Sequence, residues 1–436
     1  MHTTLRRSPR VAAITLAAAA ALVVAACQPP AGAEDEESSS SDDGSSENAD
    51  GGTFTVGLIG PMTGAVASSG QEMQQGWDLY WEINGNEVNG ITVETLVEDD
   101  AGVPETALSK ATLLVESENV DLIVGPLQSH TALAVAAYAS EAGVPNFEAV
   151  SAADDLTQRL RNDYVLRTGS MGGSQVAFVA GDWSLSEGHR SAITLCPDYA
   201  YGWESCAGFV STFTEGGGEI VDQLWVPNGT ADFSPYISQI QASGADMVFV
   251  TLSGGADGPN FLGSFNDFGV GEDIALLMNG FSSDQATIRA MGESVLGINS
   301  VNFWVEGLDT PEVNELVDAY SEAYDGNLPS TNVAGGYTTA MVVAATLEEV
   351  GLVGPEEFVA AARGLSLPAT PYGPLEFDEY NNVVLPVYVR EIVEMDDGTI
   401  RNVAIETYDE VSQFWTYDPE EFLAGDPFSR DNNGQR

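Results

Sequence analysis

The sequence predicts an α/β fold with two lobes that face each other across a cleft. Short apolar segments alternate with amphipathic segments of about ten to fifteen residues, which is the pattern of parallel βαβ units. The alternation runs through residues 53–147 and starts again near residue 176. At 436 residues, the chain is long enough for two domains with complete hydrophobic cores.

The elements of the first repeat follow from its hydrophobic pattern. Strands are expected at 54–59, 91–97, 121–124 and 144–147, and helices are expected before residue 83 and at 103–115 and 131–142. Pro104 falls in the first turn of its helix, where the missing N–H costs no hydrogen bond.

The second repeat shows the same alternation of predicted strands and helices. Helices are expected at 176–186, 203–215, 233–242 and 259–268, and strands at 191–195, 219–225, 246–251 and 274–278. Three helical segments then follow (311–324, 331–350, 356–362), with strands at 375–377 and 383–392. Open α/β sheets bind ligands beyond the carboxyl ends of their strands, so two such lobes in tandem predict a site in the cleft between them.

The chain is strongly acidic, with a net charge of −52 and Lys110 as its one lysine. Such a surface repels phosphate backbones and anionic lipids, which excludes nucleic-acid binding and attachment to membranes by charge. The acidity fits either a surface adapted to high salt, where counterions screen self-repulsion, or a cationic ligand. The scatter of the acidic residues along the chain favours the first interpretation.

The N-terminus has the layout of an export signal. Arg6, Arg7 and Arg10 precede an apolar run at 11–26 that is short for a transmembrane helix. The run ends in Val-Ala-Ala-Cys, which resembles the lipobox of bacterial lipoproteins and implies cleavage before Cys27 and lipid attachment to its thiol. A plain secretory peptide with an incidental cysteine is the alternative.

These features divide the N-terminus into a lipoprotein signal peptide at 1–26 and a disordered acidic Ser/Gly tether at 27–52. The mature chain is therefore expected to be extracytoplasmic and lipid-anchored to the cell membrane. Cys196 and Cys206 remain, and in an exported chain one leftover pair predicts a disulfide. Two reduced, buried thiols are the alternative.

Motifs for chemistry are few. No nucleophile elbow, Walker loop or dinucleotide-binding turn appears after a strand, and His130 and His189 are the histidines beyond the signal. The triplet at 98–100 precedes a helix start, where carboxylates satisfy free amides better than they suggest a metal. We therefore expect no catalytic residue, no metal and no cofactor.

Polar residues do gather where strands should lead into helices. Ser69, Ser129 and Ser151 each follow a predicted strand of the first lobe. Free amides and hydroxyls at a helix start can bind a carboxylate without a basic side chain, although serine is also an ordinary helix cap.

Several segments resemble the leucine/isoleucine/valine-binding proteins of ABC importers. They are Val-Gly-Leu-Ile-Gly-Pro-Met-Thr-Gly at 56–64, the triplet at 98–100 with Pro104, and the segments at 124–126, 166–168, 197–202 and 372–378. The resemblance implies a type I periplasmic-binding-protein fold, with two Rossmann-like lobes joined by a three-strand hinge. By the same analogy lobe one is 53–169 plus 302–378, lobe two is 170–301 plus 379–415, and 416–436 is a C-terminal tail.

The resemblance also implies ligand contacts. Ser129 matches the residue whose hydroxyl and amide hold the ligand carboxylate, and Tyr201 matches the aromatic that covers the ligand from lobe two. Val150 and Ser151 fall in the loop that supplies an amide and a hydroxyl, although the hydroxyl position itself is Ala152.

Two further positions depart from the family pattern. Phe281 stands where the family has the acid that binds the ligand ammonium, and Ser69 replaces a tyrosine near the first turn. These changes put a leucine-type ligand in doubt.

The implied function is capture of a small polar molecule, an amino acid or a related compound, and its delivery to an ABC permease. The chain is then not an enzyme, and its partners are a small-molecule ligand and a permease, with no nucleic acid and a monomeric state. A ligand sensor for a membrane receptor and an extracytoplasmic hydrolase are the alternatives.

Overall fold

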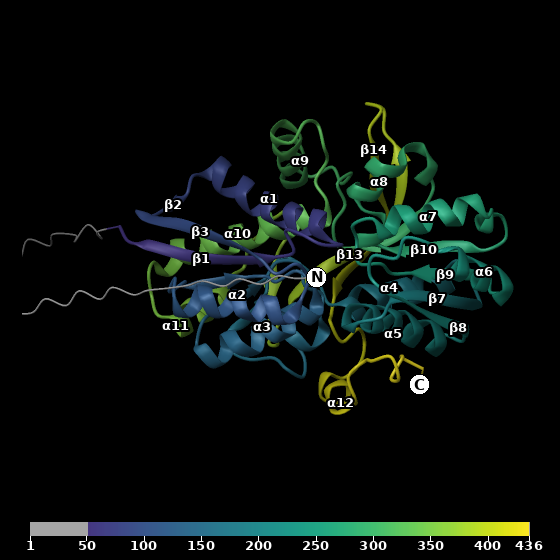
Figure 1. Cartoon of the computed structure of the whole chain (residues 1–436), viewed down its shortest axis with the longest axis horizontal. Helices are drawn as coiled ribbons and strands as arrows, with labels where there is room; N and C mark the ends of the chain where they lie inside the picture. Colours follow the sequence, from purple (N-terminus) through teal and green to yellow (C-terminus); the bar gives the residue numbers. More distant parts are fainter. Residues whose placement is uncertain (1–50, 436) are drawn as a thin grey trace, which may run out of the picture. The chain divides into compact units, whose positions relative to one another are not determined.

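The computed structural model describes residues 51–435, so the predicted signal peptide, Cys27 and nearly all of the tether lie outside the described residues. Two sheets with helices on their faces form the two lobes, as the sequence predicts (Figure 1). Among the described residues, none of the helices has both the length and the apolar character that a membrane span requires.

Lobe one contains a six-stranded sheet in the order β2-β3-β1-β4-β5-β6. The strands are β1 Thr53–Gly60, β2 Glu87–Val88, β3 Ile91–Asp99, β4 Leu122–Val124, β5 Asn146–Glu148 and β6 Val165–Arg167. All neighbours pair in parallel except β2, which is antiparallel to β3. This parallel arrangement requires helices on both faces of the sheet.

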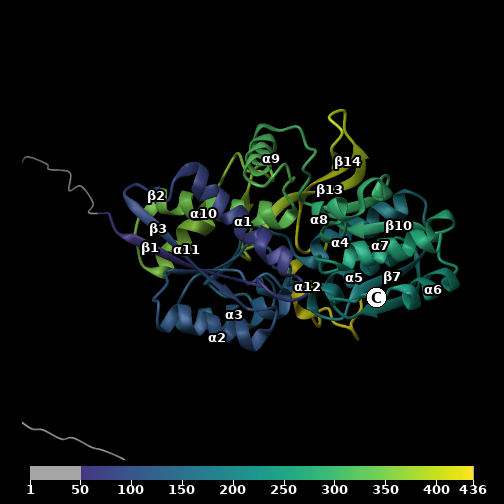
Figure 2. The same ribbon diagram turned by 45° about the horizontal axis from the view of Figure 1, so that its top comes forward.

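Those helices come from both ends of the chain. Helices α1 (Ala67–Asn84) and α10 (Thr331–Val350) cover one face, and α2 (Pro104–Glu116) and α3 (Ser129–Ala142) cover the other (Figures 1 and 2). In β1, Leu58 packs in the cluster with α1 and α10, whereas Ile59 packs with α2 and α3. Both faces of the strand are therefore buried.

Lobe two contains the strand order β12-β13-β11-β10-β9-β7-β8, with β14 paired to β13. Its strands are β7 Ser191–Pro197, β8 Glu219–Val226, β9 Met247–Val250, β10 Ala275–Asn279, β11 Asn299–Asn302, β12 Glu376–Phe377, β13 Val383–Glu394 and β14 Ile400–Val411. Its helices are α4 Gly173–Ser186, α5 Ala200–Glu215, α6 Ser234–Ser243, α7 Asp257–Asp267 and α8 Gln285–Met291. Phe249 packs in the cluster with α4 and α5, and Val250 packs in the one with α6 and α7.

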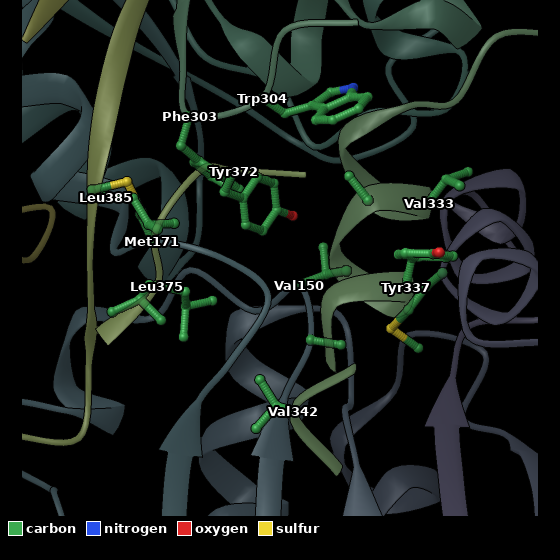
Figure 3. Packing of buried hydrophobic residues seen from close by; sticks show 14 of the residues in the cluster. Val150, Met171, Phe303, Trp304, Val333, Tyr337, Val342, Tyr372, Leu375 and Leu385 are labelled. Carbon is green, nitrogen blue, oxygen red and sulfur yellow. The ribbon is translucent and has the colours of Figure 1, made fainter. Parts of the chain in front are cut away.

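The chain passes between the lobes after β6, after β11 and before β12. Side chains from these passages pack together: Met171 follows β6, Phe303 and Trp304 follow β11, and Tyr372 precedes β12 (Figure 3). The rings of Phe303 and Tyr372 are 5.3 Å apart, and the Tyr372 hydroxyl donates to the carbonyl of Gly169 at 2.8 Å. The hinge therefore has a shared core.

The remaining helices are α9 Pro311–Ala323, α11 Pro355–Gly364 and α12 Pro419–Ala424. Helix α12 lies in the predicted C-terminal tail, and its Phe422 packs against Phe178 of α4 and Phe414. Arg159 of lobe one donates to the carbonyl oxygens of Phe422 at 2.9 Å and Gly425 at 3.1 Å. The tail is thus fastened to both lobes.

Candidate ligand-binding site

A pocket lies between the lobes, beyond the carboxyl ends of their strands. About 310 Å³ of space between the lining residues is free of protein atoms, and part of it is open to solvent. It is lined by Leu127, Gln128, Ser129, Val150, Ala152 and Asn332 of lobe one and by Tyr199, Tyr201, Ser253 and Phe281 of lobe two. All of these except Asn332 closely follow the end of β4, β5, β7, β9 or β10, which is where open α/β sheets bind ligands.

The start of helix α3 forms the polar end that lobe one contributes. Ser129 is the first residue of α3 and is 2% exposed. Gln128, at the N-cap, has extended backbone, and its side chain does not cap the helix. Because the first amides of a helix have no acceptor within it and carry partial positive charge, this end of the pocket favours an anionic or other acceptor group.

Lobe two contributes aromatic rings. The rings of Tyr201 and Phe281 meet edge to face at 6.0 Å, and those of Tyr199 and Tyr201 lie 6.1 Å apart. The Tyr201 hydroxyl donates to Oδ1 of Asn279 at 2.9 Å, and the Phe281 amide donates to the same oxygen at 3.2 Å. Burial raises the pKa of Tyr201 well above its usual value, so the ring is neutral.

Tyr199 connects the two lobes at the pocket. Its hydroxyl lies near the side chains of Ser253 in lobe two and Gln128 in lobe one, and burial raises its pKa to about 12. Its ring also meets the ring of His130 edge to face at 5.1 Å. Tyr199 therefore makes these contacts only while the lobes are close together.

The lining contains no ionisable acid or base other than the two neutral tyrosines. An ammonium group would find no carboxylate there, and a carboxylate would find no arginine or lysine. Neutral donors, among them those at the start of α3 and the side chains of Ser253 and Asn332, are the groups that can hold an anion. Over residues 51–435, no group of three or more His, Cys, Asp or Glu is arranged to hold a metal ion.

Of the residues that the sequence singled out, Ser129, Val150, Tyr201 and Phe281 line this pocket together. The local environment of Tyr201 differs from expectation. The sequence placed Tyr201 between an expected strand at 191–195 and an expected helix at 203–215, but Tyr201 lies in the first turn of α5 and is 5% exposed. The helix begins earlier because the loop after β7 is only a few residues long.

Ser69 and Ser151 do not line the pocket, contrary to expectation. Ser69 lies in the first turn of α1, and a Cβ placed on Gly254 would be 3.0 Å from its hydroxyl oxygen. Ser69 therefore faces the other lobe beside the pocket. Ser151 is fully buried, and among the described residues its hydroxyl has no hydrogen-bond partner. The chain around it points Val150 and Ala152 at the pocket instead.

Sequence reasoning missed Tyr199, Ser253 and Asn332 as lining residues. Tyr199 stands two residues before Tyr201, at the N-cap of the same helix, so its proximity was a usable signal. Asn332 had no local signal, because the return of α10 to lobe one places it beside residues that lie between 51 (Phe281) and 205 (Leu127) positions away in sequence.

Cys196 and Cys206 are joined in the structure by a disulfide with an S–S distance of 2.04 Å. Cys196 lies in β7 and Cys206 lies in α5. Tyr199 and Tyr201 belong to the loop that the disulfide closes. The crosslink thus ties the aromatic part of the pocket to the sheet.

Comparison with known proteins places the chain in a family. The family described as "Periplasmic binding protein" matches residues 53–399. The Leu/Ile/Val-binding protein homolog 6 of Brucella melitensis is 30% identical over 365 residues, covering 81% of this chain and 91% of the relative.

Solved structures agree. A solute-binding protein of an ABC transporter from Rhodopseudomonas palustris BisB5, in complex with 3,4-dihydroxybenzoic acid, is 30% identical with a TM-score of 0.79, covering 83% of this chain and 98% of that one. Another from R. palustris, in complex with 4-hydroxybenzoate, is 28% identical with a TM-score of 0.78, covering 83% and 98%. A leucine-binding protein from Thermotoga maritima shares the fold, with 23% identity, a TM-score of 0.71 and coverage of 82% and 99%.

The structure has two lobes with a pocket between them at the strand ends. The family match, which covers most of the folded chain, points to the same architecture. The chain belongs to the periplasmic binding proteins, a family that binds solutes and is not enzymatic.

Proposed function

We propose that this chain captures a small aromatic carboxylate of the hydroxybenzoate class outside the cytoplasmic membrane and delivers it to an ABC importer. The observation that carries the proposal is a pocket that combines aromatic rings with free helix-start amides and has no acidic residue in its lining. An aromatic ring of the ligand would pack against Tyr201 and Phe281, and its carboxylate would accept from Ser129 and the neighbouring amides.

Two features argue against an α-amino acid. The family's acid for the ammonium is replaced by Phe281, and Glu72, a buried carboxylate near Asn332, is already paired with Arg289. Aromatic rings also attract cations, but the positive end of α3 opposes a cation at this place. Relatives of 28–30% identity with bound hydroxybenzoates support the same class.

Isothermal titration of the purified chain with matched ligands tests the proposal. 4-Hydroxybenzoate should bind, and 4-hydroxybenzamide, in which a neutral planar amide replaces the carboxylate, should bind about ten- to a hundredfold more weakly because a charged hydrogen bond is lost. Tyramine, which carries an ammonium on an ethyl chain where 4-hydroxybenzoate has its carboxylate, and L-leucine should not compete. Binding of leucine or tyramine without binding of 4-hydroxybenzoate would overturn this ligand assignment.

The importer is tested in cells. Deleting the gene should abolish uptake of radiolabelled 4-hydroxybenzoate, and restoring it should restore uptake. Unchanged uptake, together with a changed transcriptional response to the compound, would support the sensor alternative instead.

We also propose that Cys27 carries lipid and anchors the mature chain to the membrane, as the lipobox-like junction at 24–27 implies. Cys27→Ala should release the protein into the soluble fraction, whereas Ser45→Ala in the tether should leave it membrane-bound. Retention of the Cys27 variant after a carbonate wash would refute the anchor.

A further inference from the structure

One buried carboxylate contacts both the pocket lining and the opposite lobe. Glu72 lies in α1 of lobe one, and its side chain is 8% exposed. Its Oε1 accepts from Nη2 of Arg289, in α8 of lobe two, at 2.6 Å. Its Oε2 accepts from the Ser330 hydroxyl at 2.7 Å and from Nδ2 of Asn332, a pocket-lining side chain, at 3.3 Å.

The same region holds further contacts between the lobes. Nη1 of Arg289 donates to the carbonyl of Leu328 at 3.3 Å, just before α10. The amide of Thr331, at the start of α10, donates to Oδ2 of Asp284 in lobe two at 2.6 Å. The start of α10 is thus held from lobe two at several points beside the pocket.

We propose that Glu72 is a positioning residue for ligand retention. It holds Asn332 in place at the pocket, and its pairing with Arg289 forms only when the lobes close, so the pair slows release of a bound ligand. The inference rests on the solute-binding function of the family and not on the aromatic character of the ligand.

Glu72 and Arg289 differ in how deeply their side chains are buried. Glu72 is almost enclosed, whereas the Arg289 side chain is 35% exposed. Removing Arg289 leaves a carboxylate buried without its cation in the closed state, which costs more than removing both charges. Glutamine at position 72 still accepts from Ser330 or Asn332 and leaves Arg289 free to reach water.

This asymmetry gives a sharp test by stopped-flow release of ligand from the full chain. Arg289→Gln should release ligand about tenfold faster, and Glu72→Gln about threefold faster, with association changed less than about twofold because the pair acts after encounter. The double variant should release ligand no faster than Glu72→Gln, and so more slowly than Arg289→Gln alone. A role in stability alone would lower the melting temperature of these variants and leave their release rates at the wild-type value.

The matched control is Glu98→Gln. It removes the Glu98–Lys110 ion pair, which is 2.7 Å long and lies within lobe one. The change in charge is the same, and the release rate should stay at the wild-type value. Raising the salt concentration should speed release from the wild type and narrow its difference from Arg289→Gln, since screening weakens a partly exposed pair.

Two probes keep this inference separate from the ligand assignment. Release is measured with 4-hydroxybenzoate and with L-leucine, so failure of the first to bind refutes the proposed ligand while the second still decides the role of Glu72. The rate of hydrogen exchange at the Thr331 amide can be measured in the ligand-free chain and so needs no ligand. This exchange rate should be higher in Arg289→Gln than in the wild type. The inference would be overturned if Arg289→Gln and Glu72→Gln both showed wild-type rates of ligand release and hydrogen exchange. It would also be overturned if the effects of the two substitutions on release were additive in the double variant.

Discussion

The phenolic hydroxyl of Tyr201 donates to Oδ1 of Asn279 over 2.9 Å, so this hydroxyl is used within lobe two and the ring is what Tyr201 offers to a ligand. Tyr201→Phe should therefore keep ligand affinity within about threefold, at a small cost in stability from one lost hydrogen bond. Tyr201→Ala removes the ring and should weaken binding at least about tenfold. Titration with 4-hydroxybenzoate compares the two, and equal losses would mean that the hydroxyl makes the contact.

Ser129 and Ser151 form a natural pair of test and control. Ser129→Ala should weaken binding of a carboxylate by about ten- to a hundredfold, because it removes a hydrogen bond to a charged group. Ser151→Ala should leave affinity unchanged, since Ser151 does not line the pocket. Both variants are measured by titration beside melting of the ligand-free chain. A wild-type affinity for Ser129→Ala would exclude the start of α3 as the anion site.

Asp284 should give the ligand-free chain an unusual dependence on pH. Burial chiefly, with smaller contributions from Glu306 and Glu72 against that of Arg390, raises the pKa of Asp284 to about 7, whereas an unfolded aspartate titrates near pH ~3.9. The folded state therefore holds this proton more tightly. Its stabilising effect is fully present below the unfolded pKa and is lost as pH rises through the folded one.

Stability should accordingly fall by about 1 kcal/mol between pH ~6.5 and ~8. Urea unfolding across this window measures the slope, and Asp284→Asn should reduce it. Glu148 and Glu204, whose pKa values burial also raises, act in the same direction in both proteins. Burial lowers the pKa of His130, so at lower pH this residue makes stability rise with pH, opposite to Asp284. The window therefore starts at pH ~6.5, above the range in which His130 titrates. A slope that is equal in Asp284→Asn and in the wild type would assign the proton to another group.

The disulfide should support both stability and binding. Replacing Cys196 and Cys206 with alanine should cost about 2–3 kcal/mol of unfolding free energy, the scale expected for a loop of this size. Affinity should fall as well, because the loop carries Tyr199 and Tyr201. Mass spectrometry of the unreduced, alkylated chain checks the bond itself, and two alkylated thiols would rule it out.

The sequence revealed the fold where both faces of an element are buried. Continuous apolar runs such as β9 predict strands of a parallel sheet, and the structure has them. Strand β14 was missed because it lies at the edge of its sheet and is largely exposed, so charged residues interrupt its pattern. The short elements β6, β11, α8 and α12 carry too few periodic positions to be recognised.

The site was predictable where a lining residue closely follows a strand end, as Ser129, Val150, Tyr201 and Phe281 do. A strand end does not determine which side chain turns toward the cleft. For this reason the sequence indicated Ser151 as a ligand contact, whereas its neighbours Val150 and Ala152 line the pocket. Asn332 and the Glu72–Arg289 pair depend on contacts between distant segments. No local pattern encodes such contacts.

The packing of α12 concerns two boundaries in the chain, the end of the family match and the end of the folded unit. The stretch shared with the family ends at residue 399, yet β14 and α12 lie beyond it, with Phe422 against Phe178. A chain cut at the inherited boundary would uncover that apolar contact and leave one side of β13 unpaired. The end of the family match at residue 399 is therefore not the end of the folded unit.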